Sequence, residues 1–90
     1  MYYCKACERE TLVYTRSKCF SANCSISEFY KKLNENNFFK SHRSYIVNLD
    51  KISEIIPWFN NTFIVKFPNL DVEIPVSRNN ISEFKHLMGI

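Results

Sequence analysis

Short apolar runs separated by charged or polar residues make up the first quarter of the chain. Residues 2–7 and 11–15 carry the aromatic and β-branched positions of two strands, and a charged turn at 8–10 separates them. This pattern predicts a β-hairpin. Polar residues at 16–18 indicate a second turn, and residues 19–23 predict a short third strand.

A helix is predicted after this β segment. Ser25 and Glu28 form a capping box, in which the Ser25 hydroxyl accepts from the Glu28 amide and the Glu28 side chain reaches back. Four apolar residues then recur at the spacing of one helical face: Ile26, Phe29, Tyr30 and Leu33. The pattern predicts an amphipathic helix of about three turns over residues 26–35. Three asparagines are expected to end it: Asn34, Asn36 and Asn37.

The stretch Phe38–Asn48, which reads FFKSHRSYIVN, combines a cationic centre with apolar flanks. Its polar centre holds three basic or titratable side chains and two hydroxyls: Lys40, Ser41, His42, Arg43 and Ser44. The apolar residues on both sides predict strands. Two strands that hold out a short cationic, hydroxyl-rich loop would suit an anion such as phosphate.

A second hairpin is predicted in the latter half of the chain. Residues 52–59 and 62–67 are apolar runs, and Pro57 favours a sheet edge or a bulge for the first of them. Asn60 and Asn61 separate the runs as a two-residue turn, because asparagine tolerates positive φ.

The C-terminal residues complete a mostly β pattern. Residues 72–76 predict a further strand, and a helix is expected to begin near Ser77 or Asn80 and to stop at Gly89. The sum is about six strands, a short central helix and a C-terminal helix in one domain, as expected for 90 residues.

Composition narrows the class of partner only slightly. The net charge of +3 and the pI of about 8.7 favour an anionic partner, but no basic tail or stripe stands out. The N-terminus does not read as a secretory signal, and no apolar run approaches the length of a membrane span. We therefore expect a cytosolic protein with reduced cysteines and no membrane partner.

The four cysteines leave two readings open. Cys4 and Cys7, together with Cys19 and Cys24, could supply four thiolates to one zinc ion. Against this, Glu8 stands where a zinc knuckle usually has glycine, and positions three apart in a strand face opposite sides. Free thiols are the preferred interpretation, so no metal or cofactor is expected, and redox sensing stays open.

Catalysis and single-strand binding are also disfavoured. His42 could act as a catalytic base, but the sequence offers no Gly-rich phosphate loop, no nucleophile elbow and no His-Glu pair at ligand spacing. An enzyme with a small-molecule substrate is therefore not expected. Trp58 and Phe59 could form a stacking platform for single-stranded nucleic acid, but at least one of them is expected in the core.

Three blocks of the sequence resemble the LytTR DNA-binding domain, the output module of many bacterial response regulators. They are FFKSHRSYIVNLDKI at 38–52, PWFNNTFIVKF at 57–67 and IPVSRNNISEFKHLMGI at 74–90. Their order and spacing match the family's pattern, strongly over 38–90 and weakly over 1–24. The resemblance implies an elongated, mostly β fold of small, mainly antiparallel sheets.

By the same resemblance, loops rather than a recognition helix bind double-stranded DNA, entering successive major grooves and often bending the duplex. The expected contact residues are Lys40, Ser41, His42, Arg43, Ser44, Asn60, Asn61, Ser77, Arg78 and Asn79. His42, Arg43 and Arg78 are expected to read base edges. Lys40, Ser44, Asn60 and Asn61 are expected to sit on phosphates and set the register. The Glu8–Glu10 turn is a weaker candidate because it is acidic.

The resemblance also sets expectations about what surrounds the domain. Family domains usually begin with another strand and follow a receiver domain, so we expect a single LytTR-like domain over 1–90 that lacks both. A second copy on repeated half-sites is an expected partner. The alternative hypothesis is a protein-interaction or oligomerisation module that pairs through the sheet edge left by the missing strand.

Overall fold

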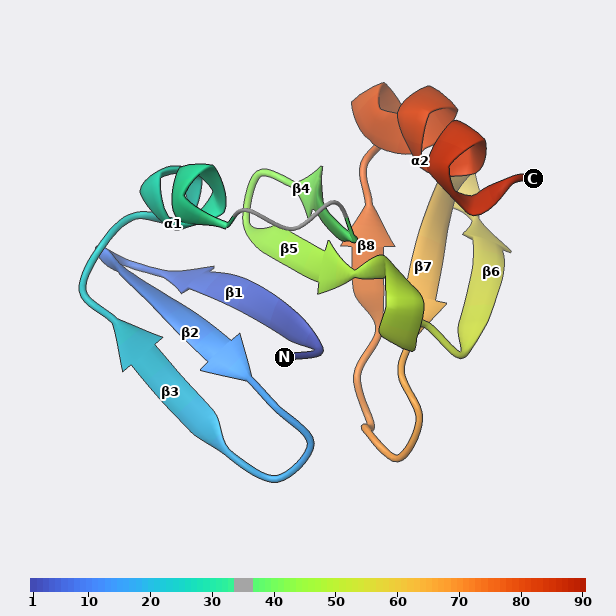
Figure 1. Cartoon of the computed structure of the whole chain (residues 1–90). Helices are drawn as coiled ribbons and strands as arrows, with labels where there is room; N and C mark the ends of the chain where they lie inside the picture. Colours follow the sequence, from blue (N-terminus) through green and yellow to red (C-terminus); the bar gives the residue numbers. More distant parts are fainter. Residues whose placement is uncertain (34–36) are drawn as a thin grey trace.

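The computed structural model describes residues 1–33 and 37–90, and in these residues the fold is mostly β (Figure 1). The strands are β1 (Tyr3–Cys7), β2 (Glu10–Tyr14), β3 (Cys19–Ala22), β4 (Phe38–His42), β5 (Tyr45–Asn48), β6 (Glu54–Trp58), β7 (Thr62–Lys66) and β8 (Ile74–Val76). The α-helices are α1 (Ile26–Lys32) and α2 (Ile81–Met88). Short 3-10 turns are η1 (Leu49–Lys51), η2 (Phe59–Asn61) and η3 (Arg78–Asn80).

The strands of this described part form two antiparallel sheets. The first has the order β3-β2-β1-β5-β4, and the second has the order β6-β7-β8. Helix α1 lies against the first sheet, and α2 lies across the end of β8 and the second sheet (Figure 1). This arrangement confirms the mostly β fold of small antiparallel sheets with one helix between strands and one at the C-terminus.

Strand alternation gives the first sheet a buried face on each side. In β1, Tyr3 packs with Phe84 of α2 and the second sheet in the larger core, whereas its neighbour Cys4 packs with Ile26 of α1 in the smaller core. Successive side chains of a strand point to opposite faces, so one strand serves both cores. The first sheet therefore holds α1 on one side and the second sheet with α2 on the other.

Helix α1 begins at the predicted residue but is shorter than predicted, and α2 begins at Ile81, next to the predicted Asn80. The Glu28 amide donates to the Ser25 hydroxyl at 3.2 Å, which confirms the N-terminal cap. Leu33 already has extended backbone angles, φ −79° and ψ 117°, so the helix contains seven residues rather than about three turns. The expected helix end at Asn34 and Asn36 lies outside the described residues. Gly89 ends α2 in a left-handed conformation at φ 72°, as predicted.

Both hairpins of the resemblance region form, with corrected details. The expected loop 40–44 is mostly strand, because β4 continues through His42 and only Arg43 and Ser44 make the turn. The register shifts between Phe39 and His42, so this end of β4 is irregular. In the second hairpin Asn60 and Asn61 have φ of 56° and 59°, as the predicted turn requires. Strand β6 is an edge strand, in agreement with Pro57.

Candidate nucleic-acid interface

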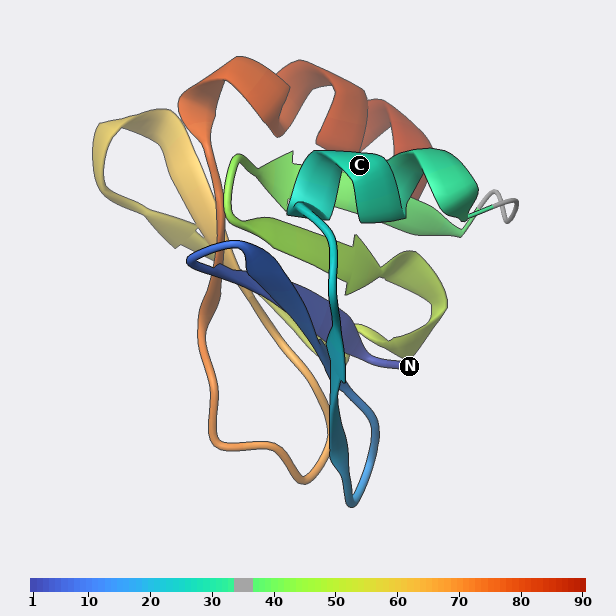
Figure 2. The same ribbon diagram turned by 90° about the vertical axis from the view of Figure 1, so that its left-hand side faces the viewer.

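Four connecting segments lie along one side of the molecule, at the left of Figure 2. They are the β1–β2 turn (Glu8-Arg9), the β4–β5 turn (Arg43-Ser44), the β6–β7 tip (Phe59–Asn61) and the β8–α2 segment (Ser77–Asn80). We call this side the loop face. The second, third and fourth of these segments contain most of the residues that the sequence singled out for DNA contact.

Ser41 fixes the β8–α2 segment to β4. Its backbone carbonyl accepts from the Ser77 amide at 2.8 Å and from the Asn80 side-chain amide at 3.0 Å. Its hydroxyl donates to the carbonyl of Pro75 at 2.9 Å. The side chain is fully buried, so it has no exposed surface to offer a partner, whereas Ser41 was expected among the exposed contact residues. Ser41 instead positions Ser77 and Asn80, whose side chains bond each other at 2.7 Å.

The β4–β5 turn is held by two further bonds. The Ser44 carbonyl accepts from the Ala6 amide of β1 at 2.8 Å, which joins this turn to the first hairpin. The Ser44 amide donates to Nδ1 of His42 at 3.1 Å. Because Nδ1 accepts a hydrogen bond, a neutral His42 carries its proton on Nε2, which is then the donor available to a partner.

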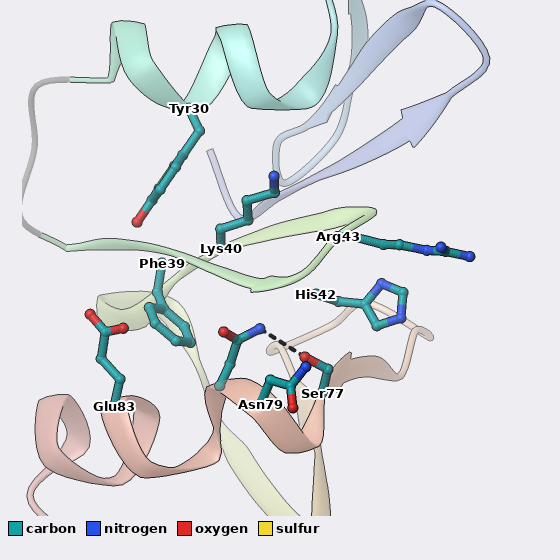
Figure 3. A pocket seen from close by; sticks show the side chains of 9 residues that line it. Tyr30, Phe39, Lys40, His42, Arg43, Ser77, Asn79 and Glu83 are labelled. Carbon is teal, nitrogen blue, oxygen red and sulfur yellow. Dashed lines mark hydrogen bonds between the residues drawn. The ribbon is translucent and has the colours of Figure 1, made fainter.

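An open hollow lies between α1, β4 and the β8–α2 segment (Figure 3). It has a volume of about 420 Å³, and its lining includes five residues of the expected set: Lys40, His42, Arg43, Ser77 and Asn79. Tyr30 and Glu83 also line the hollow, although no sequence pattern pointed to them. Their positions on α1 and α2 become neighbours of β4 only through the tertiary packing.

Lys40 and Arg43 lie differently in this hollow. The Lys40 ammonium donates to the Ser27 hydroxyl of α1 at 2.8 Å, so its charge lies beside the helix. Arg43 is exposed at the turn, and its guanidinium points away from the hollow in Figure 3. The two cations therefore flank His42 in two directions rather than forming one pocket.

A second hollow of about 370 Å³ joins the β6–β7 tip to the start of α2. Asn61, Arg78 and Lys85 provide its polar lining together with Ser82. Asn60, Asn61, Arg78 and Asn79 are all exposed. The loop face thus presents guanidinium, amide, hydroxyl and imidazole donors, the groups that bind phosphate oxygens and the acceptor-rich edges of base pairs.

Comparison with known proteins agrees with this chemistry. The family model described as LytTr DNA-binding domain matches residues 1–89. This chain belongs to the LytTR family. The family is a class of DNA-binding domains rather than a class of enzymes.

The relatives of this LytTR domain include a transcriptional regulatory protein and a sensory transduction protein. The transcriptional regulatory protein YpdB of Escherichia coli K12 is 50% identical over 90 residues, which are 100% of this chain and 37% of YpdB. The sensory transduction protein LytT of Enterococcus faecalis is 37% identical over 83 residues, 92% of this chain and 34% of LytT. The chain thus spans about a third of the length of these relatives.

A solved LytTr DNA-binding domain from Bacillus cereus has the same fold as this LytTR domain. The two superpose with a TM-score of 0.87 at 31% identity, and the match covers 99% of this chain and 81% of the other. No helix in residues 1–33 and 37–90 is long and apolar enough to cross a membrane.

The cysteines of the LytTR domain lie in different environments. Cys4 is buried and its thiol contacts the Met1 sulfur at 3.0 Å, whereas Cys7 and Cys19 are exposed. Burial raises the pKa of the Cys4 thiol to about 12. Within the described residues no three His, Cys, Asp or Glu side chains gather as a metal site would require.

The aromatic pair beside Asn60 departs from expectation. Trp58 is 48% exposed and Phe59 is 74% exposed, so the expectation that at least one belongs to the core is wrong. Strand β6 is an edge strand, and its last residue and the following tip reach beyond the packed part of the domain.

Proposed function

We propose that this domain binds double-stranded DNA sequence-specifically through the loop face, as the output domain of a bacterial transcriptional regulator. The observation that carries the proposal is the placement of the loop segments on one side of the molecule (Figure 2). The molecule measures 33 Å along its longest axis, and one turn of B-DNA is about 34 Å. The longest dimension of the domain is therefore comparable to the spacing of successive major grooves on one side of the duplex.

Three exposed or half-exposed side chains are the proposed base readers. The guanidinium groups of Arg43 and Arg78 are exposed, and each can donate two parallel bonds to guanine O6 and N7. The half-buried His42 is oriented by the bond from the Ser44 amide. Its Nε2 donor would meet a single acceptor on a base edge.

The remaining polar residues are proposed to set position rather than sequence. The first hollow is lined by Ser77 and Asn79. The β4–β5 turn contains Ser44, and the β6–β7 tip contains Asn60 and Asn61. Their short hydroxyls and amides suit phosphate oxygens, which lie between the grooves.

Lys40 is proposed to contribute charge to phosphate contact. To reach a phosphate, the Lys40 ammonium must either break its hydrogen bond to the Ser27 hydroxyl or keep that bond while another of its protons binds the phosphate. Since a Lys–phosphate contact is independent of base identity, Lys40→Ala should weaken binding to all duplexes alike and flatten its salt dependence.

A mobility-shift titration with a matched pair of arginine variants tests the proposal. The duplex is first selected from a random pool with the wild-type domain. Arg78→Ala should weaken binding to this duplex by about 1–3 kcal/mol, and much less to a scrambled duplex. Arg16→Ala is the control, because Arg16 is exposed in the β2–β3 turn at the bottom of Figure 2, away from the loop face.

Equal affinities for Arg78→Ala and Arg16→Ala on the selected duplex would remove Arg78 from the readers. A domain that forms a stable oligomer and is indifferent to DNA would instead support the interaction-module alternative. The same titration gives stoichiometry, and two domains per selected duplex are expected if the site consists of repeated half-sites.

A further inference from the structure

The β6–β7 tip carries the most exposed aromatic residue of the described chain. Phe59 is 74% exposed, and the neighbouring Trp58 is 48% exposed. The two rings meet edge to face, with centroids 5.3 Å apart and planes at 74°. Leaving two large apolar side chains in water forgoes the free energy that burial would give, which points to a partner for this tip.

The local backbone holds Phe59 out at the tip. The last ladder pair of the hairpin is Trp58 with Thr62, so Phe59 lies outside the ladder. Both the amide and the hydroxyl of Thr62 donate to the Phe59 carbonyl, the hydroxyl at 2.6 Å. Left-handed backbone at Asn60 and Asn61 closes the turn behind it. The tip is therefore a tight turn that presents an aromatic ring, rather than a loose loop.

The surroundings of the tip identify the chemistry of the partner. The hollows on this side of the molecule are lined by the cations of Arg78 and Lys85 and by the Asn61 amide. A third hollow is lined by Pro57, Trp58 and Phe59. None of the residues that line these three hollows is Asp or Glu. Aromatic rings among cations and amides complement a polyanion that also offers flat apolar surfaces, which describes nucleic acid.

We propose that Phe59, backed by Trp58, is an apolar wedge that enters a base step of the bound duplex and partly unstacks it. This inference rests on the proposed function, because the tip lies on the same loop face as the β4–β5 turn and the β8–α2 segment (Figure 2). A wedge loses stacking between two bases and regains contact between the ring and a base face. It therefore favours flexible pyrimidine–purine steps and adds a sequence preference without a hydrogen bond to a base.

The test places 2-aminopurine, whose fluorescence rises when it is unstacked, at successive positions of the selected duplex. Wild-type protein should raise the fluorescence at one step. Phe59→Ala should abolish this rise in fluorescence and weaken binding by about tenfold. In the Phe59→Ala background, the preference for the selected duplex over a scrambled one should still depend on Arg78. Trp58 is the only tryptophan of the chain, so quenching of its emission on binding gives a second readout from the protein side.

Two matched variants complete the design. Phe20→Ala removes another exposed phenylalanine, 52% exposed on the edge strand β3, and should leave both the fluorescence rise and the affinity unchanged. Phe59→Leu keeps an apolar tip and should retain part of the rise. If circular dichroism shows that Phe59→Ala is unfolded, the wedge is tested by comparing the fluorescence rise and the affinity of Phe59→Leu with those of wild type.

The outcomes separate the wedge from the proposed function. A wild-type domain that binds the selected duplex without any rise in 2-aminopurine fluorescence, and with an affinity equal to that of Phe59→Ala, overturns the wedge alone. A wild-type domain that binds no duplex overturns the proposed function as well. Oligomers that Phe59→Ala dissociates, with duplex affinity unchanged, would assign the tip to contact between proteins and overturn the wedge.

Discussion

Replacing Ser41 by alanine tests whether this residue is a structural link rather than a DNA contact. The hydroxyl is fully buried and donates to the Pro75 carbonyl at 2.9 Å. Its removal loses one hydrogen bond, worth about 1 kcal/mol, and leaves a partly buried carbonyl without that donor, for a total of roughly 1–3 kcal/mol. For a domain of this size, 1 kcal/mol corresponds to about 4–8 °C in Tm.

Urea unfolding followed by circular dichroism measures this change in the free energy of unfolding. Ser53→Ala is the control, because the Ser53 hydroxyl donates to the Lys66 carbonyl at 3.1 Å in an exposed position. Water can replace that bond, so Ser53→Ala should cost less than about 0.5 kcal/mol. Below its melting range, folded Ser41→Ala should bind the selected duplex within about twofold of wild type.

Two results would refute this reasoning. A cost for Ser41→Ala no larger than that for Ser53→Ala would mean that the bond to Pro75 does not stabilise the joint between β4 and β8. A folded Ser41→Ala variant with strongly weakened DNA binding would restore Ser41 to the contact set that the sequence suggested.

Four further predictions concern stability, thiol reactivity and charge. Ser25→Ala removes the cap of α1 and should lower the free energy of unfolding by about 0.5–2 kcal/mol, measured in urea, with no change in duplex affinity as the control. Folding raises the pKa of the Cys4 thiol from 9.0 to about 12. The stability that the buried neutral thiol contributes is therefore complete below pH 9 and is lost as the pH rises toward 12. Thermal melts should show a shallower alkaline loss of stability for Cys4→Ala than for wild type, and an equally steep loss would contradict this assignment. In the native domain, a thiol reagent at pH 8 should modify Cys7 and Cys19 quickly and Cys4 only on unfolding; equal rates for all three would be inconsistent with burial. Finally, Lys40→Ala should reduce the slope of log affinity against log salt by about 1 on selected and scrambled duplexes alike.

Local chemistry predicted the elements that depend on a few neighbouring residues. The capping box at Ser25 and the paired asparagines at Asn60 and Asn61 specify a helix start and a tight turn by themselves, and both are present. Gly89 likewise stops α2 where a left-handed residue is required. These signals act over three or four residues and do not depend on the rest of the fold.

Positions that depend on tertiary packing were predicted less well. Ser41 looked like a loop residue because it lies among cations, but β4 continues through it and turns it to the same side as the buried Phe39. Trp58 looked like a core residue because it is large and apolar, but β6 is an edge strand. The burial of a strand residue depends on which other strands pair with it, and that information is not local.

The lining of the first hollow likewise depends on tertiary packing and could not be predicted from local sequence. His42 and Ser77 are 35 positions apart in sequence, yet both line it, together with Tyr30 from α1. The resemblance named the polar residues of two segments, and the packing of β4 between the two helices brings them together. Tyr30 has the spacing of a core-facing helix residue, so its presence at the hollow carries no separate sequence signal.

Selection of bound duplexes from a random pool, carried out in parallel with wild type and Arg78→Ala, tests the central proposal most directly. We predict that wild type enriches a defined sequence, and that Arg78→Ala enriches the same sequence with the base preference relaxed at the position that Arg78 reads. A wild-type pool without any enriched sequence, or two pools with identical preferences, would contradict sequence reading by this loop face.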